Sequence, residues 1–68
     1  MKIPGRKIKE RRKERGLSQA ELGALIGVSG QQIMRYEVHG IENMRVRRLV
    51  AICEVFGCTA NDLLEGGE

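Results

Sequence analysis

Several residue types are scarce in this chain of 68 residues, and their scarcity narrows the range of folds and chemistries. There is no Trp, and there are only one Phe, one Tyr and one Pro. No segment shows sustained alternation of apolar and polar residues, which argues against a sheet and favours a small helical bundle. A chain of this length is expected to form one domain over residues 1–68, with little room for a deep substrate pocket beside its core.

Histidine and cysteine are also rare. His39 is the only histidine, and Cys53 and Cys58 are the only cysteines. Five positions apart, the cysteines do not fit a CxxC metal or redox motif. Cys53 falls on an apolar helix face, so we interpret it as a core residue, and a disulfide is not expected in a reducing cytosol. Because His39 has no second imidazole and no evident nucleophile near it, we expect no metal site, no cofactor and no enzymatic activity.

Long apolar runs are missing, and the charge is unevenly distributed. Without a run that suits a membrane span or a signal peptide, the expected location is the cytoplasm. The net charge is +3, and residues 1–15 contain eight of the twelve Lys and Arg, whereas residues 54–68 contain none. A basic N-terminal region and an acidic C-terminal region suggest an anionic partner. A charged helix face that is simply exposed to solvent accounts equally well for this charge distribution.

Two helix-start signals lie within residues 17–37. Ser18 followed by Glu21, and Ser29 followed by Gln32, both have the spacing of a capping box. Gly27 lies between them, where a helix that ends in a left-handed residue favours glycine. Two capped helices joined by so short a turn cross steeply, which is the geometry of a DNA-reading helix-turn-helix over residues 18–38.

The whole chain reads as an all-α fold of five helices. Apolar residues at helical spacing, such as Val46, Leu49, Ile52 and Phe56, indicate a helix with one buried face. Residues 39–44 are expected to form a loop, and the ends, about 1–4 and 65–68, to be disordered. The predicted helices cover residues 6–15, 18–26, 29–38, 45–56 and 60–64.

The order of these motifs resembles the Cro/C1-type (XRE-like) helix-turn-helix domains of phage repressors and related bacterial regulators. The resemblance spans about residues 8–64 and rests on RxxxGLSQ at 12–19, AEL at 20–22, IGVS at 26–29, IxxYE at 33–37 and FGCT at 56–59. It implies a five-helix lambda-repressor-like bundle that binds duplex DNA and regulates transcription. Repression is the expected form of this regulation. A phage repressor, a restriction–modification controller and an antitoxin all remain open.

The resemblance also implies which residues touch DNA. Helix 29–38 is expected in the major groove, where Gln suits adenine and Arg suits guanine. Met34 either touches a thymine methyl group or fills a gap. Gly30 stands where such domains often carry a side chain aimed at DNA, which removes one expected base contact. The expected base contacts are Gln31, Gln32, Arg35 and Met34, and the expected phosphate contacts are Gln19, Ser29, His39, Asn43 and Arg45.

Further residues match positions with other roles. Arg12 and Glu37 match an ion pair that ties the first helix to the third. Because one copy reads few base pairs, a homodimer on an inverted-repeat operator is expected. Its interface is expected at Val55, Cys58, Thr59 and Leu64. The alternative function is a protein-interaction module of the same fold, such as an antitoxin or a polymerase-docking domain, with weak or non-specific DNA binding.

Overall fold

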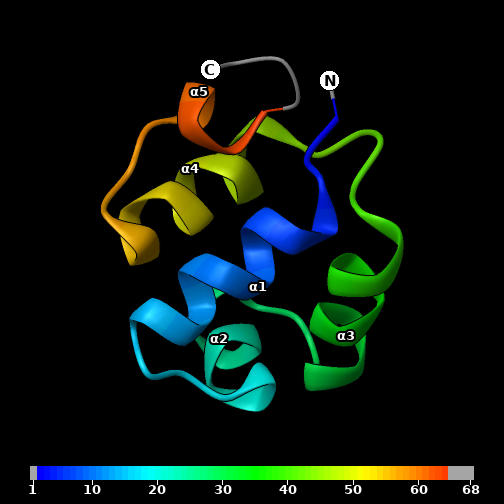
Figure 1. Ribbon diagram of the computed structural model, residues 1–68, viewed down its shortest axis with the longest axis vertical. Helices are drawn as coiled ribbons and strands as arrows, with labels where there is room; N and C mark the ends of the chain where they lie inside the picture. Colours follow the sequence, from blue (N-terminus) through cyan, green and yellow to red (C-terminus); the bar gives the residue numbers. More distant parts are fainter. Residues whose placement is uncertain (1, 65–68) are drawn as a thin grey trace.

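Five helices make up most of residues 2–64, the part of the chain that the computed structural model describes (Figure 1). They are α1 (Gly5–Glu14), α2 (Gln19–Ile26), α3 (Gly30–His39), α4 (Val46–Phe56) and α5 (Ala60–Leu63). The all-α prediction is confirmed, with every helix boundary within one residue of its expected place. Helices α2, α3 and α4 begin one residue late because the sequence signal marks the capping residue, which precedes the helix. The predicted disorder at 65–68 falls outside the described residues.

Capping interactions fix the starts of α2 and α3. The Ser18 hydroxyl accepts from the Glu21 N–H at 3.0 Å, and the Glu21 carboxylate accepts from the Ser18 N–H at 2.8 Å, so this predicted capping box is confirmed. The bond from the Ser18 backbone, followed by that from its side chain, lowers the pKa of Glu21. At α3 the Ser29 hydroxyl accepts from the Gln32 N–H at 3.1 Å, but the Gln32 side chain lines a surface hollow instead of completing the box.

Two glycines allow α2 and α3 to cross closely. A Cβ atom on Gly23 would lie 2.5 Å from the carbonyl oxygen of Val28, and one on Gly30 would lie 3.1 Å from Cα of Ala20. The backbone therefore sets the distance between the helices. A Cβ atom at Gly30 would contact the backbone of Ala20 on α2, and the expectation that Gly30 removes a base contact stays a prediction.

The core consists of apolar side chains from all five helices and from two flanking segments. Within residues 2–64 no polar or charged residue is buried as a whole, although the side chains of Arg12 and Glu37 are largely covered, and no helix has the length and apolar character needed to cross a membrane. Val46, which its spacing placed in the core, is 70% exposed because it is the first residue of α4 and extends past the packed face. The buried hydrophobic residues are Ile3, Ile8, Leu22, Ile26, Ile33, Ile41, Leu49, Ile52, Phe56 and Leu63.

Residues 2–4 belong to the fold, so the prediction of a disordered leader is wrong for them. Ile3 is 1% exposed and exchanges two backbone hydrogen bonds with Ile41, at 2.8 and 2.9 Å. Figure 1 shows this first segment beside the loop that follows α3. Gly5 allows the close approach, since a Cβ atom there would lie 2.2 Å from the carbonyl oxygen of Glu37. The first residues therefore hold the end of α3 in place.

Candidate functional site

The outer side of α3 carries most of the residues expected to contact bases. Gln31 and Arg35 are exposed and lie four positions apart, so both point from the same side of the helix. Met34 lies between them and is 47% exposed, which leaves both interpretations of this residue open. On the opposite side Ile33 is fully buried in the core. The helix therefore presents the polar pair Gln31 and Arg35 outward, with apolar Met34 between them, while its inner side is anchored.

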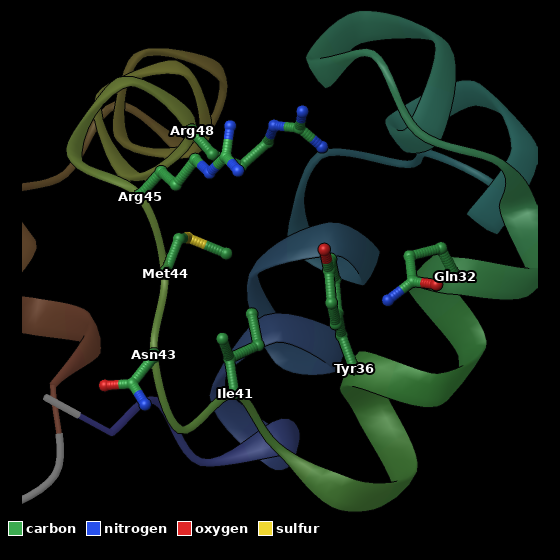
Figure 2. Close-up of a pocket in the computed structure, with 7 residues that line it drawn as sticks. All are labelled: Gln32, Tyr36, Ile41, Asn43, Met44, Arg45 and Arg48. Atoms are coloured by element: carbon green, nitrogen blue, oxygen red, sulfur yellow. The ribbon is translucent and has the colours of Figure 1, made fainter.

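A hollow of about 330 Å³ lies between α3 and the start of α4 (Figure 2). Figure 2 shows the ring of Tyr36 standing between Gln32 and Met44, with its hydroxyl toward the end of the hollow where the arginines lie. Amide, phenol and guanidinium groups are all hydrogen-bond donors, so their combination suits an anionic oxygen. The lining residues are Gln32, Tyr36, Ile41, Asn43, Met44, Arg45 and Arg48.

Arg48 is a site residue that the sequence reasoning did not select. Arg45 precedes α4 and Arg48 follows three positions later, so the two side chains extend over the same hollow. The first turn of α4 contains no acidic residue, and Arg45 makes no side-chain capping hydrogen bond. The partial positive charge of a helix start adds to that of the arginines and favours an anion there. The three-residue spacing was the signal in the sequence that pointed to Arg48.

An ion pair joins α1 to α3 on the inner side of the site. Arg12 donates to both carboxylate oxygens of Glu37, at 2.5 and 3.2 Å, and also to the carbonyl oxygen of Leu17 at 2.8 Å. The side chains of Arg12 and Glu37 are only 11% and 5% exposed. Burial acts to raise the pKa of Glu37, but hydrogen bonds from Arg12 and Gln19 outweigh it and lower the pKa. Glu37 is therefore charged at neutral pH and holds α3 against α1.

Gln19 belongs to the same network. Its amide nitrogen donates to Glu37 Oε1 at 3.1 Å, which orients the side chain at the start of α2. An amide nitrogen carries two hydrogens, so the second is left for another acceptor. The ion pair thus also determines where the Gln19 donor points.

The other expected phosphate contacts lie in different parts of the surface. Asn43 and Arg45 both line the hollow beside α3. Ser29 lies at the turn before α3, where its hydroxyl caps the helix. His39 is exposed as the last residue of α3 and is not among the residues that line the hollow. The structure therefore brings Asn43 and Arg45 together and places Ser29 at the other end of α3 from His39.

The residues expected at a dimer interface are only partly on an open apolar surface. Val55 and Leu64 are half-buried against the core, and Thr59 caps α5 with its side chain. A second hollow, of about 380 Å³, is mostly apolar and includes Cys58 but not the other three. It is lined by Val46, Leu49, Val50, Cys53, Glu54, Gly57, Cys58 and Ala60.

Comparisons with known proteins agree with this architecture. A search of curated proteins found no match. The P22 c2 repressor, solved in complex with a synthetic operator, superposes with a TM-score of 0.80 and is 30% identical over 97% of this chain and 98% of its own. The N-terminal DNA-binding domain of the biofilm regulator SinR from Bacillus subtilis gives a TM-score of 0.77 and 28% identity over 97% of both chains. The model of the helix-turn-helix family HTH_3 matches residues 8–63, and the chain therefore belongs to this family, of the Cro/C1 type.

Proposed function

We propose that this protein is a transcription regulator that binds duplex DNA with α3 in the major groove, and that it acts as a repressor. The observation that carries the proposal is the exposed pair Gln31 and Arg35 on a helix whose inner side is fixed by Ile33 and Glu37. Support comes from the family and from the P22 c2 repressor, whose structure contains an operator, and the SinR domain, which is described as DNA-binding.

Base recognition is assigned to the outer residues of α3. Gln31 can pair with adenine through two hydrogen bonds, and Arg35 can pair in the same way with guanine, each pair discriminating by about 1–3 kcal/mol. Gln32 is half-buried and faces the hollow, so it reaches a base only at the edge of the contact surface. Met34 contacts a thymine methyl group when the sequence presents one, and otherwise fills space.

Phosphate contacts are assigned to both sides of α3. On one side Gln19 offers its second amide hydrogen and Ser29 offers its hydroxyl. On the other side Asn43 and Arg45 hold a phosphate over the hollow, together with Arg48. His39 adds a contact only where the DNA curves toward the end of α3. Each cation that neutralises a phosphate adds about 0.9 to the slope of log affinity against log salt.

A homodimer on an inverted repeat follows from the small size of one contact surface. Two copies of α3 would then enter successive major grooves about 34–36 Å apart. The pairing surface is assigned to the region of Val55, Cys58, Thr59 and Leu64, next to the apolar hollow on α4. In this role the protein acts in the cytoplasm as a binding protein and needs no cofactor.

The proposal is tested by selecting binding sites from a random pool of duplex DNA at about 150 mM salt and sequencing the bound fraction. We expect an enriched inverted repeat with half-sites about one turn apart. Arg35→Ala should relax the preference at one base position of each half-site. Lys13→Ala is the matched control, because it removes one exposed positive charge from α1, outside the assigned contact surface.

Two results would refute the proposal. In the first, the protein binds only at low salt and enriches no sequence, which is the behaviour of a merely electrostatic contact. In the second, Lys13→Ala and Arg35→Ala change the selected sequences equally. The first result would favour the protein-interaction module instead, and the second would show that base recognition does not depend on the outer side of α3.

A further inference from the structure

Cys53 lies in the last turn of α4 and Cys58 follows two residues after its end, and Figure 1 shows this end of α4 on the far side of the molecule from α3. α4 ends at Phe56, and Gly57, with a φ of 66°, turns the chain back on itself. The N–H of Cys58 consequently donates to the carbonyl oxygen of Cys53 at 3.1 Å. In helix ends closed by this bond, the side chains at those two positions frequently contact each other. Here the two free thiols lie close enough for each to influence the pKa of the other.

Both thiols are accessible from one opening in the surface. Cys53 and Cys58 are each half-buried, and both line the apolar hollow of about 380 Å³. Val46 and Val50, on the same hollow, are 70% and 49% exposed, so its mouth is open. A small molecule can thus reach either sulfur without unfolding of the core.

Positive charge is fixed directly over this turn. Arg15 donates from Nη2 to the carbonyl oxygen of Phe56 at 2.7 Å, and a Cβ atom on Gly57 would lie 2.4 Å from the same nitrogen. Burial is the largest influence on the pKa of Cys58 and raises it, and the charge of Asp62 adds to the rise. Arg11 and Arg15 act in the opposite direction, but the pKa of Cys58 stays above its ordinary value. An anionic reactant is therefore attracted to Cys58.

We propose that Cys53 and Cys58 form a reversible redox pair, which a small anionic disulfide of the glutathione disulfide class oxidises to an intramolecular disulfide. The site goes beyond the proposed DNA binding and uses none of its residues on α3, but it shares Cys58 with the assigned pairing surface, so the reaction takes place on the unpaired chain. The expectation of free thiols in a reducing cytosol still holds under ordinary conditions, because a reduced glutathione pool keeps such a pair reduced.

The reaction consists of two thiol–disulfide exchanges. The Cys58 thiolate attacks one sulfur of glutathione disulfide, whose S–S bond breaks and releases one glutathione thiolate. The Cys53 thiolate then attacks the Cys58 sulfur, so the protein disulfide forms and the second glutathione leaves. The pair loses two electrons, which reduce glutathione disulfide, and its two protons are taken up by the two glutathione thiolates. Excess reduced glutathione reverses both steps.

The test uses the folded, reduced protein with excess glutathione disulfide, followed by acid quench and intact mass spectrometry. We expect a monomeric product lighter by two hydrogens, free of glutathione, that returns to the original mass with excess reduced glutathione. Cys53→Ser should instead accumulate a stable mixed disulfide at Cys58, because the second exchange is blocked. Circular dichroism checks that each variant is folded.

A charge variant tests the assigned order of attack. Arg15→Gln should react more slowly than wild type with both disulfides, because less Cys58 thiolate is present, and severalfold more slowly still with glutathione disulfide than with neutral hydroxyethyl disulfide, because only the anionic reactant also loses the attraction of Arg15. Lys13→Gln removes the charge of a nearby exposed residue on α1, and this variant should react like wild type with both disulfides. Three results would overturn the proposal: a lasting glutathione adduct on the wild type, a covalent dimer as the main product, or oxidation of the pair only after unfolding in urea.

Discussion

Replacing Glu37 with Gln removes the negative charge that joins α1, α2 and α3 while it preserves the size of the side chain. Glu37 accepts hydrogen bonds from Arg12 at 2.5 and 3.2 Å and from Gln19 at 3.1 Å. Since the Arg12 and Glu37 side chains are 11% and 5% exposed, water replaces little of what is lost. We expect the variant to be less stable than wild type but to select the same DNA bases, because Glu37 faces α1 rather than the outer side of α3.

The size of the loss follows from the number of bonds to the charged group. A hydrogen bond to a charged group contributes about 1.5–3 kcal/mol, against about 1 kcal/mol for a neutral one. Gln keeps one acceptor oxygen and turns an N–H₂ group toward Arg12, so one bond is lost and another weakened, a cost of about 2–4 kcal/mol. A 68-residue domain has a total stability of about 3–10 kcal/mol. The melting temperature should therefore fall by roughly 8 °C or more.

The assay is thermal unfolding followed by circular dichroism near neutral pH, alongside the DNA selection. Glu42→Gln is the matched control, because Glu42 pairs with Lys2 at 3.7 Å and the two side chains are 76% and 46% exposed. Exposed pairs contribute about 0–1 kcal/mol, so this control should melt close to wild type. If Glu37→Gln also melts like wild type but selects different bases, Glu37 acts at the DNA and the reasoning is refuted.

Three further changes have defined outcomes. The pKa of Glu37 in the folded state lies below its ordinary value of 4.5, so the stabilisation that Glu37 provides is present at pH values above 4.5. This stabilisation is lost as the pH falls through the folded-state pKa. In urea denaturation the stability difference between wild type and Glu37→Gln should accordingly shrink on acidification below that ordinary value, and a constant difference would contradict the assignment. Gly23→Ala should lower the urea midpoint despite about 1 kcal/mol of better helix propensity, because its Cβ would lie 2.5 Å from the Val28 carbonyl oxygen; a raised midpoint would show that the crossing has room. Ile3→Ala should lower the free energy of unfolding by about 2–5 kcal/mol, because the side chain is 1% exposed, whereas exposed Lys2→Ala should change it little. Equal effects of these last two substitutions in urea would mean that the first segment does not pack as described.

The parts of the fold that the sequence predicted well depend on interactions between near neighbours. The Ser18–Glu21 box needs only four consecutive residues, so its spacing alone located the start of α2. Ser29 likewise located α3, although the side chain of Gln32 has a tertiary alternative in the hollow. The family resemblance added Arg12 and Glu37, which lie 25 positions apart and which no local pattern connects.

The parts that were missed depend on contacts between distant segments. Ile3 looked like a loose end because its partner, Ile41, lies in a loop without a strand pattern of its own. Arg48 was overlooked because its place beside Tyr36 requires the position of α4 relative to α3. In each case tertiary packing decides, and the sequence offers at most a weak local signal, such as the three-residue spacing between Arg45 and Arg48.

The two sides of α3 differ in how freely they can be changed. Ile33 and Glu37 fix the position of the helix from within, whereas Gln31, Arg35 and Val38 are exposed, and Val38 by as much as 70%. Exposed side chains without packing roles can be exchanged at little cost in stability. The exposed residues of α3 can thus be replaced while its buried contacts hold the helix in position. Transplanting the outer residues of another regulator onto α3 offers a direct way to redirect the protein to a new DNA sequence.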